Sequence, residues 1–256
     1  MKQWPKLTML LIALAVILAA LGAACGAAYA IATDATFYVD DSREAVAAYL
    51  GREVGKEGLL DADEHAVTMY IGLTREEQTA FASETARMMG EQQARFELDV
   101  LQAHEQQHMR DVRDLILLAN RVAKMCMTAA AILALLAAWT GASLADRSRT
   151  GLLGAACGIG ALAAIAGVFL LAMNTAGFER LFFKMHELLF TNRYWLLNPK
   201  TDILIRMMPQ PLFERALVML LVRAGRAFAL VLAVLAAAYG LIGGMVRRNL
   251  TEGKQA

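Results

Sequence analysis

The chain has 256 residues and a formal net charge of +1, and 58% of its residues are hydrophobic. This length admits one or two domains, but the hydrophobic fraction and a mean hydropathy of +0.44 favour a membrane protein over a soluble one. The charge is unevenly distributed, because residues 34–114 carry 18 acidic and 8 basic side chains, a net charge of −10. So acidic a segment argues against a nucleic-acid partner.

Four long runs of the chain carry no charged side chain: Leu7–Thr33, Met125–Ala145, Thr150–Phe178 and Ala227–Val246. Each is near or above the roughly 20 residues that a helix needs to cross the hydrocarbon core of a bilayer. We therefore predict an all-α membrane protein with four transmembrane helices and a mainly helical extracellular cap. The predicted segments are 1–33 with the first span, 34–121 as the cap, 122–178 with the second and third spans, 179–215 as a second outer segment, and 216–256 with the fourth span.

Small residues predict how the spans pack. Gly22–Gly26 and Gly154–Gly158 share the sequence Gly-Ala-Ala-Cys-Gly, and small residues four positions apart let two helices approach closely. All three cysteines, Cys25, Cys126 and Cys157, lie in the apolar runs. They predict neither a disulfide framework nor a paired metal site, and we interpret them as small hydrophobic packing residues.

The first run follows Lys2 and Lys6, as the apolar part of a secretory signal peptide does, and Leu21–Cys25 approaches the cleavage sequence of a lipoprotein. However, the run stays uncharged as far as Thr33, well beyond the usual apolar core of a signal peptide. We therefore predict that the first span is not cleaved.

The positions of Lys and Arg predict the orientation in the membrane. Three short segments carry a cluster of them: Lys2, Lys6, Arg147, Arg149, Arg247, Arg248 and Lys254. Because such residues favour the cytoplasmic side, we expect both termini and the loop at 146–149 in the cytoplasm of a cell-membrane protein, with the cap and the second outer segment extracellular. Six Lys and Arg residues between Phe178 and Arg215 weaken this expectation without reversing it.

Within the cap, the short alternation of Thr33–Asp41 is compatible with a strand or an extended segment. Ser42 begins a predicted helix that ends near Gly51, and His65–Gly72 is ambiguous between strand and helix. Thr74 and Glu77 form a capping-box pattern that predicts a long helix, interrupted before the second span only by Gly90. In the second outer segment, prolines predict an irregular path over Asn198–Pro211.

Residues 178–213 combine His186, Asp202, three of the four prolines and seven aromatic residues. Loops between spans are normally short and polar, so this composition indicates a structured patch at the depth of the lipid headgroups. An aromatic belt that only anchors the protein remains the simpler alternative.

His104-Glu-Gln-Gln-His108 matches the H-E-x-x-H signature, in which two histidines on one helix face bind zinc and the glutamate acts as base. A third ligand would have to come from His186 or Glu187. The two glutamines are less apolar than a buried zinc helix usually has. A zinc-dependent membrane protease therefore stays open as an alternative, although we assign no metal ligand.

His108 and His186 form a second possible pair, because both are expected on the outer side about two turns from a membrane span. Asp111 follows His108 by three residues on the same helix face, where its carboxylate could orient the imidazole. Two imidazoles at one interface can act as base and acid near neutral pH. Either histidine alone could equally be an ordinary packing residue.

The residues around this pair resemble a known family. His108-Met-Arg-Asp-Val precedes the second span, and later follows Phe182-(x)3-His186-(x)3-Phe190-(x)4-Trp195-Leu-Leu-Asn-Pro-Lys-Thr-Asp202-(x)2-Ile205-(x)3-Pro209-(x)3-Phe213. This pattern and the four spans resemble the lipoprotein intramolecular transacylases (Lit). The chain departs at Asn198, where the family usually has aspartate, and at Gln210, where glutamate is common. Residues 34–103 show little resemblance, and His104 and Glu105 lie outside the pattern.

The resemblance implies that His108 and His186 are the catalytic pair. It implies transfer of the sn-2 acyl chain of a diacylglyceryl-modified lipoprotein onto the α-amine of its N-terminal cysteine, which gives the lyso form. The expected partners are diacylated lipoproteins and membrane lipid, and no cofactor is needed because an ester is exchanged for an amide. The residues expected to bind substrate or support the site are Asp111, Phe182, Phe190, Tyr194, Trp195 and Asp202. A non-enzymatic membrane adaptor is the remaining alternative.

Overall fold

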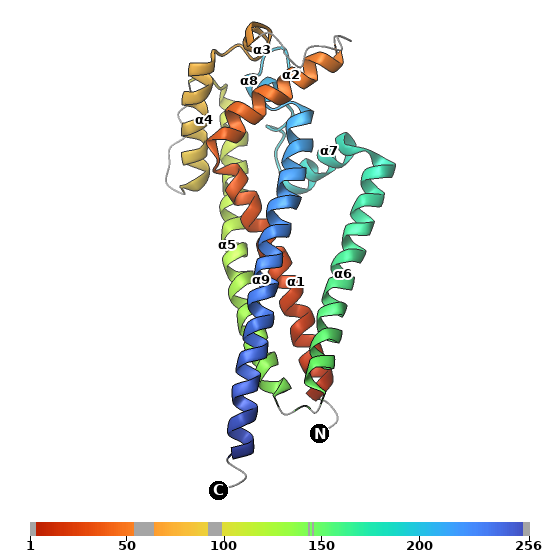
Figure 1. Cartoon of the computed structure of the whole chain (residues 1–256). Coiled ribbons are helices and arrows are strands. Elements are labelled where there is room, and N and C mark those ends of the chain that lie inside the picture. Colours follow the sequence, from red (N-terminus) through yellow and green to blue (C-terminus); the bar gives the residue numbers. More distant parts are fainter. Residues whose placement is uncertain (1–3, 54–63, 92–98, 143, 145, 253–256) are drawn as a thin grey trace. The chain divides into compact units, whose positions relative to one another are not determined.

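The computed structural model describes residues 4–53, 64–91, 99–142, 144 and 146–252. Within these ranges the regular secondary structure is helical and includes no strand (Figure 1). The chain forms two compact units. The span unit comprises Met1–Gly26, Arg121–Asn174 and Val222–Ala256, and the site unit comprises Ala27–Asn120 and Thr175–Leu221.

Four helices are long and apolar enough to cross a membrane: α1 (Trp4–Ala32), α5 (Ala103–Gly141), α6 (Arg147–Ala176) and α9 (Gln210–Glu252). The prediction of an all-α membrane protein with four spans is confirmed. The 39 residues of α5 extend over about 58 Å, roughly twice the thickness of the hydrocarbon core. The helix is therefore long enough for its polar first part, residues 103–120, to lie outside the hydrocarbon. This part belongs to the site unit.

Close helix contacts at glycines hold the span unit together. A Cβ atom on Gly154 or Gly158 would lie 2.8 Å from the carbonyl oxygen of Met9 or 2.9 Å from that of Ala13, so α6 packs its pentad directly against α1. The other pentad does the same toward α5, because a Cβ atom on Gly22 would lie 3.2 Å from the carbonyl oxygen of Ala123. Both predicted small-residue contacts are present, and larger side chains at these glycines would push the helices apart.

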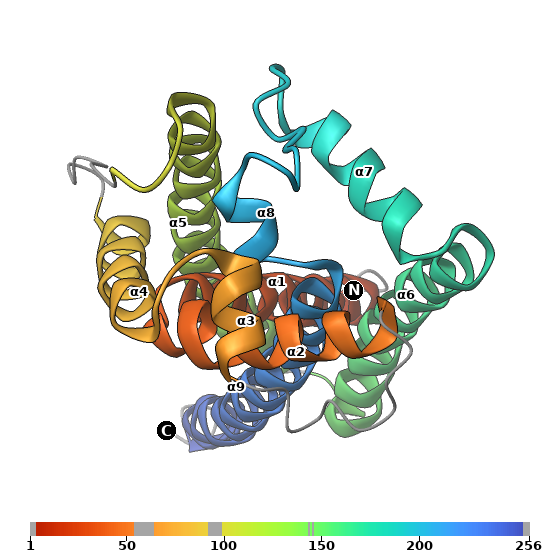
Figure 2. The same cartoon turned by 90° about the horizontal axis from the view of Figure 1, so that it is seen from above.

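The site unit has an apolar core made by short helices. These are α2 (Ser42–Glu53), α3 (Glu64–Ile71), α4 (Arg75–Gly90) and α8 (Ile203–Met207). Ile71, Met88, Met89 and Met207 are fully buried in this core. Met109, from the first part of α5, belongs to the same core. Seen from above, α8 lies between the start of α5 and α3 (Figure 2). The core therefore fixes α8 next to the helix that carries His108.

The expected strand or extended segment at Thr33–Asp41 is wrong. The chain is helical there and includes a π-helical stretch, η1 (Phe37–Asp41). Phe37, Tyr38 and Val39 are all buried, whereas a half-exposed strand would bury only alternate residues. Tertiary packing against α4 has thus overridden a short alternation that looked like a strand.

The structure also decides the predictions for the cap segment from His65 to the start of α5. The ambiguous segment His65–Gly72 is helical: α3 ends at Ile71, and Gly72 follows it with φ +84°, a conformation that suits glycine. The capping box of Thr74 and Glu77 is present, with Thr74 N–H donating to Glu77 Oε2 at 2.8 Å and Glu77 N–H donating to Thr74 Oγ1 at 3.2 Å. The helix that follows, α4, ends at Gly90, the one interruption expected before the second span, and the next described helix, α5, begins at Ala103. Residues 92–98 lie outside the described part.

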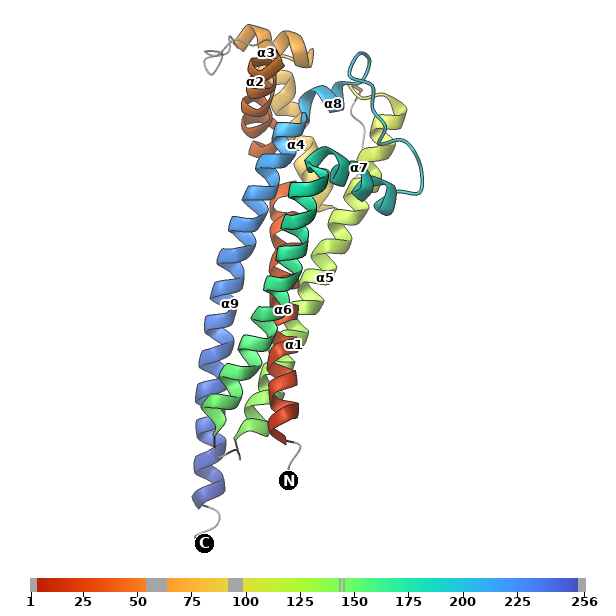
Figure 3. The same ribbon diagram turned by 90° about the vertical axis from the view of Figure 1, so that its right-hand side faces the viewer.

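Helix α7 (Phe178–Leu189) and a loop lead to α8 (Figure 3). Gly177, at φ +80°, separates α6 from α7. The segment Asn198–Pro211 is less irregular than expected, since it includes the short helix α8, of 5 residues, and the start of α9 at Gln210. Pro211 is accommodated in the first turn of α9, where a helix leaves its N–H groups unpaired anyway.

Candidate active site

His108 and His186 lie together in the site unit. Their ring centroids are 5.9 Å apart, and the rings are tilted by 41°. Both side chains are buried, with 8% and 7% of their surface exposed. His108 comes from the polar first part of α5 and His186 from α7, 78 positions later in the chain. The fold therefore brings together the two histidines that the sequence pattern singled out.

Aromatic rings enclose His186 on several sides. The Phe182 ring centroid is 4.2 Å from that of His186, and those of Trp195 and Phe190 are 5.1 Å and 5.4 Å away. Phe190 also lies edge-on to His108 at 5.1 Å. Such an apolar surrounding excludes water from the imidazoles and disfavours their charged forms.

A backbone hydrogen bond fixes the tautomer of His186. Its Nδ1 lies 2.8 Å from the carbonyl oxygen of Phe182, one helical turn earlier. A carbonyl oxygen can only accept, so Nδ1 carries the hydrogen and Nε2 of the neutral ring holds the free lone pair. Burial lowers the pKa of His186 below its ordinary value, against a smaller opposite effect of this hydrogen bond. His186 is thus a neutral base at neutral pH, with Nε2 as its basic atom.

His108 is held neutral more strongly. Burial first, and then the neighbouring His186, lower the pKa of His108 from 6.5 to about 4, although Asp111 acts in the opposite direction. Its Nδ1 is buried and has no hydrogen-bond partner among the described residues. A neutral imidazole still has one N–H group, so His108 can donate a hydrogen bond without carrying charge.

Asp111 does not orient His108 through a hydrogen bond, which corrects the role expected from the sequence. Its Oδ1 accepts from Gln107 Nε2 at 2.8 Å, and its Oδ2 accepts from Asn192 Nδ2 at 2.8 Å. Asn192 in turn accepts a hydrogen bond from Trp195 Nε1 through its carbonyl oxygen, at 3.0 Å. Asp111 therefore ties the aromatic loop after α7 to the helix that carries His108.

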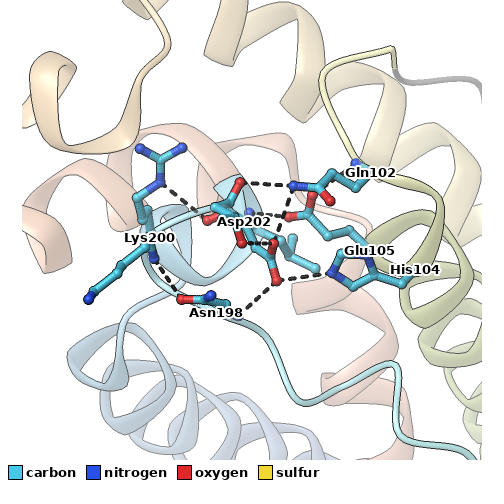
Figure 4. Close-up of polar contacts among 9 residues, drawn as sticks. Gln102, His104, Glu105, Asn198, Lys200 and Asp202 are labelled. Carbon is cyan, nitrogen blue, oxygen red and sulfur yellow. Dashed lines mark hydrogen bonds and ion pairs between the residues drawn. The ribbon is translucent and has the colours of Figure 1, made fainter.

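Asp202 is the centre of a second polar cluster (Figure 4). Its Oδ2 accepts from Asn198 N–H at 2.7 Å and from His104 Nε2 at 3.0 Å, and its Oδ1 accepts from Thr201 Oγ1 at 2.7 Å. Burial alone would raise the pKa of Asp202, but the hydrogen bonds from Asn198, His104 and Thr201 bring the pKa below its ordinary value. The ionised carboxylate closes the Asn198–Asp202 turn and binds it to α5.

Glu105 has a structural position in this cluster. Its side chain is fully buried. Oε2 accepts from Gln102 N–H at 2.9 Å and Oε1 accepts from Leu204 N–H at 2.8 Å. The first bond is half of a capping box at the start of α5, and the second satisfies an N–H group in the first turn of α8. His104 and Glu105 thus connect α5 to the Asn198–Leu204 segment.

This arrangement accounts for the H-E-x-x-H signature without zinc. His104 is paired with Asp202, whereas His108 faces His186, so the two histidines have different neighbours. Among the described residues, no group of three or more His, Cys, Asp or Glu side chains is placed to hold a metal ion. The geometry offers nothing in favour of the protease alternative.

Tyr194, like Asp202, is a predicted site residue that the structure does not bring to the two histidines. Tyr194 is 46% exposed, its ring is not among the ring contacts of the described residues, and its backbone N–H donates to Asn192 Oδ1 at 3.0 Å. Asn192 was not singled out from the sequence, although its place in a short polar turn is typical of an asparagine that holds backbone by its side chain. Glu105 was also set aside, although Gln102 and Glu105 have capping-box spacing.

Solved structures support the same architecture. The membrane integral lipoprotein intramolecular transacylase Lit from Bacillus cereus matches with a TM-score of 0.60 at 16% identity, over 97% of this chain and 100% of that one. A variant of that protein with one histidine replaced by arginine matches with a TM-score of 0.61 at 17% identity, over 96% and 94% of the two chains. At such low identity these matches show the fold. A search of curated protein sequences found no match.

The family itself is shown by the sequence. The family model described as lipoprotein intramolecular transacylase Lit matches residues 7–213, from the first span to the start of α9. This range includes His108, His186 and the whole segment that joins them. The expected family, and with it an acyltransferase integral to the membrane, is confirmed: the chain belongs to the lipoprotein intramolecular transacylase family.

Proposed function

We propose that His186 is the general base and His108 the hydrogen-bond donor in a transacylation of diacylated lipoproteins. The substrate is a lipoprotein whose N-terminal cysteine carries a diacylglyceryl group and a free α-amine. The sn-2 acyl chain moves to this amine and leaves a lyso-form lipoprotein. The observation that carries the assignment of roles is the 2.8 Å contact between His186 Nδ1 and the Phe182 carbonyl oxygen, because it directs the basic lone pair to Nε2.

The bonds and protons balance within the substrate and the histidines. The amine nitrogen attacks the sn-2 ester carbonyl, and His186 Nε2 takes the amine proton. A carbon–nitrogen bond forms while the carbonyl oxygen becomes an oxyanion, which accepts a hydrogen bond from the neutral His108 ring. The carbon–oxygen bond to glycerol then breaks, and the His186 imidazolium returns its proton to the leaving glyceryl oxygen. An ester and an amine become an amide and an alcohol, so no cofactor takes part.

The aromatic surroundings support this chemistry in two ways. Burial keeps both imidazoles neutral at neutral pH, which is the form that a base and an uncharged donor need. Phe182, Phe190 and Trp195 also restrict the space beside His186. The reaction passes through a medium-sized ring that brings amine and ester together, and a confined site lowers the entropy cost of that arrangement.

The experiment is coexpression of each variant with a diacylated lipoprotein, followed by mass spectrometry of the lipoprotein's N-terminal peptide. His186→Ala and His108→Ala are expected to abolish most transfer of the acyl chain to nitrogen. His65→Ala, which changes an exposed histidine of α3, is the matched control and should retain activity. Full conversion by a well-expressed His186→Ala protein would show that His186 is not the base.

We also propose that both termini and the 146–149 loop are cytoplasmic and that the site unit faces outward. The clustering of Lys and Arg in the short segments supports this orientation. It is the side on which the lipid-modified N-terminus of an exported lipoprotein would meet His108 and His186.

A further inference from the structure

We propose that α7 is an in-plane membrane helix whose apolar face contacts the acyl chains of the lipid leaflet. Met185, Leu188 and Leu189 make this lipid face. The docking itself is independent of the catalytic roles proposed above. Its consequence, that lipid contact holds His186 at the depth where substrate esters lie, rests on that proposed function.

Helix α7 has three distinct faces. Phe182 and His186, one turn apart, face the aromatic site. Arg180, Lys184 and Glu187 are exposed and share a second face, on which Lys184 Nζ pairs with Glu187 Oε2 at 2.6 Å. Such a division is typical of a helix that borders protein, water and lipid at once.

The third face is apolar and uncovered. Leu181, Met185, Leu188 and Leu189 follow i, i+4, i+7 and i+8 spacing, which places them in one stripe. Leu188 is 85% exposed, and Met185 and Leu189 are 42% and 45% exposed. Single exposed leucines are ordinary, but a stripe of adjacent ones on a helix that also buries a catalytic candidate needs an apolar neighbour.

The chain connection identifies that neighbour as lipid. Only Gly177 separates α7 from α6, one of the four helices that can cross a membrane. The end of α6 presents Val168, Leu170 and Leu171 as exposed apolar side chains. A one-residue connection keeps the start of α7 at the membrane surface where α6 emerges. Tyr194 and Trp195 follow α7 in the loop, and these residue types concentrate at the interface between lipid and water.

Gly177 makes the connection possible. Its φ of +80° lies in the region that residues with a Cβ atom rarely adopt, and an added Cβ would meet nothing within 4 Å. Glycine is therefore needed for the backbone angle and not for space. The positive φ ends α6 and lets a separate amphipathic helix begin at once.

The test measures the depth of single labelled positions. Cys25, Cys126 and Cys157 are replaced by alanine, and an environment-sensitive fluorophore is attached at Leu188→Cys or, as the matched control on the adjacent face, at Glu187→Cys. Each protein is reconstituted into phosphatidylcholine vesicles with and without brominated acyl chains. The label at 188 is expected to emit at shorter wavelength and to be quenched about twofold or more by brominated lipid, and the label at 187 much less.

Other occupants give different results. Equal, weak quenching at 188 and 187 would place both positions in water and overturn the proposal. A blue-shifted label at 188 that brominated lipid does not quench would indicate a protein neighbour, such as a second copy of the chain, and would equally overturn it. Repeating the measurement with His186→Ala separates docking from catalysis, because lipid contact should persist in the inactive protein.

A functional comparison completes the test. Leu188→Asp places a charge on the lipid face and should raise the lipoprotein concentration needed for half-maximal conversion, while Leu188→Met should not. The control Glu187→Gln changes the exposed polar face of α7 and should leave conversion unchanged. Conversion by Leu188→Asp equal to wild type, in a protein of equal thermal stability, would refute the role of lipid docking in positioning the site.

Discussion

Glu105 Oε1 accepts a hydrogen bond from Leu204 N–H at 2.8 Å, although the two residues are 99 positions apart in the chain. The bond joins the first turn of α5 to the first turn of α8. His108 lies one turn further along α5, so the position of a catalytic candidate depends on a contact that carries no chemistry itself. A buried carboxylate with two backbone donors is also difficult to replace.

The first prediction concerns Glu105. Glu105→Ala leaves the N–H groups of Gln102 and Leu204 without their acceptor and should destabilise the protein by about 1–3 kcal/mol, because the Leu204 N–H is buried whereas Gln102 is exposed to water. Glu105→Gln keeps one carbonyl oxygen as acceptor and should be milder. Thermal unfolding of the detergent-purified proteins measures the order, with the exposed Glu76→Gln as control.

The same variants discriminate against a zinc protease. In such an enzyme the glutamate of the signature activates water, so Glu105→Gln would be inactive even when stably folded. We expect Glu105→Gln to retain substantial transacylation and chelators to have no effect. An inactive but fully stable Glu105→Gln protein would contradict the structural role of this residue.

The second prediction concerns Asp202. Asp202→Asn removes the charge from an acceptor of several hydrogen bonds and should reduce stability by about 1–3 kcal/mol and turnover only in part. His104→Ala removes one of these donors at a half-exposed position and should cost less. Melting temperature and conversion should fall together. If Asp202→Asn folded normally but were as inactive as His186→Ala, Asp202 would have a direct part in catalysis.

Sequence patterns predicted the spans well because their cause is local. A run of about 20 uncharged residues crosses a bilayer whatever its tertiary contacts, and a capping box such as Thr74 and Glu77 forms within one turn. The segment Thr33–Asp41 was misjudged because Phe37, Tyr38 and Val39 owe their burial to α4 and α9, which lie far away in sequence. Gly90, the one interruption expected in the helix after Thr74, is where α4 ends, because glycine is a weak helix former wherever it stands.

In the site, too, features with a local cause were predicted and features that depend on distant residues were not. The spacing of His186, Phe190 and Trp195 follows from one helix and one loop, so the resemblance located them. His104, Glu105 and Asp111 each have a partner that lies 81 to 99 positions away, and no local pattern reveals such long-range pairings. The expected bond from Asp111 to His108 had the right spacing, but Asn192 supplies a donor for that carboxylate instead.

The third prediction concerns the pH dependence of stability. Burial and the neighbouring His186 lower the pKa of His108 to about 4, with Asp111 opposing them, so between 6.5 and that value the unfolded chain binds a proton that the folded protein does not. The free energy of unfolding must therefore fall as the pH decreases through this range, by at most roughly 3 kcal/mol from this group. Above pH 6.5 His108 is neutral in both the folded and the unfolded chain, so it should no longer make the free energy of unfolding depend on pH.

His108→Asn removes the titrating ring and should flatten that dependence, whatever it does to stability at pH 8. Melting temperatures of both proteins across the range, in one detergent, measure the difference. His186→Ala is a useful companion, because loss of the second imidazole should allow His108 to protonate at somewhat higher pH. Parallel curves for wild type and His108→Asn would show that His108 is not buried in its neutral form.

The fourth prediction concerns orientation. In the protein with its native cysteines replaced, a single cysteine at Arg149 should resist an impermeant thiol reagent applied to intact cells, whereas one at Lys200 should react. Both side chains are exposed, so access by the reagent reports the side of the membrane and not burial. Permeabilised cells provide the control, in which both positions should be labelled. Labelling of position 149 in intact cells would reverse the proposed topology.

The final prediction tests whether the two histidines act in one step. A general base typically contributes about 10²–10⁴-fold, so His186→Ala should reduce the rate by a factor in that range. Loss of an oxyanion donor typically costs about 10²–10³-fold, which is the reduction expected for His108→Ala. Groups that serve the same transition state are not additive. The double variant should therefore be scarcely slower than the slower single variant, whereas independent roles would multiply the two losses.

The pH profile then identifies the base. The substrate α-amine attacks only in its neutral form and has an ordinary pKa of about 8, so the wild-type rate should begin to fall below that pH. Burial lowers the pKa of His186 below the ordinary 6.5, so a second, steeper fall should follow with its midpoint below 6.5. Below that midpoint Nε2 is protonated and cannot take the amine proton. His108→Ala keeps the base but removes a neighbouring ring and its burial, so its slow residual reaction should retain the second fall. The residual reaction of His186→Ala should show only the fall that protonation of the substrate amine causes. A second fall that persists in His186→Ala but disappears in His108→Ala would exchange the roles of the two histidines.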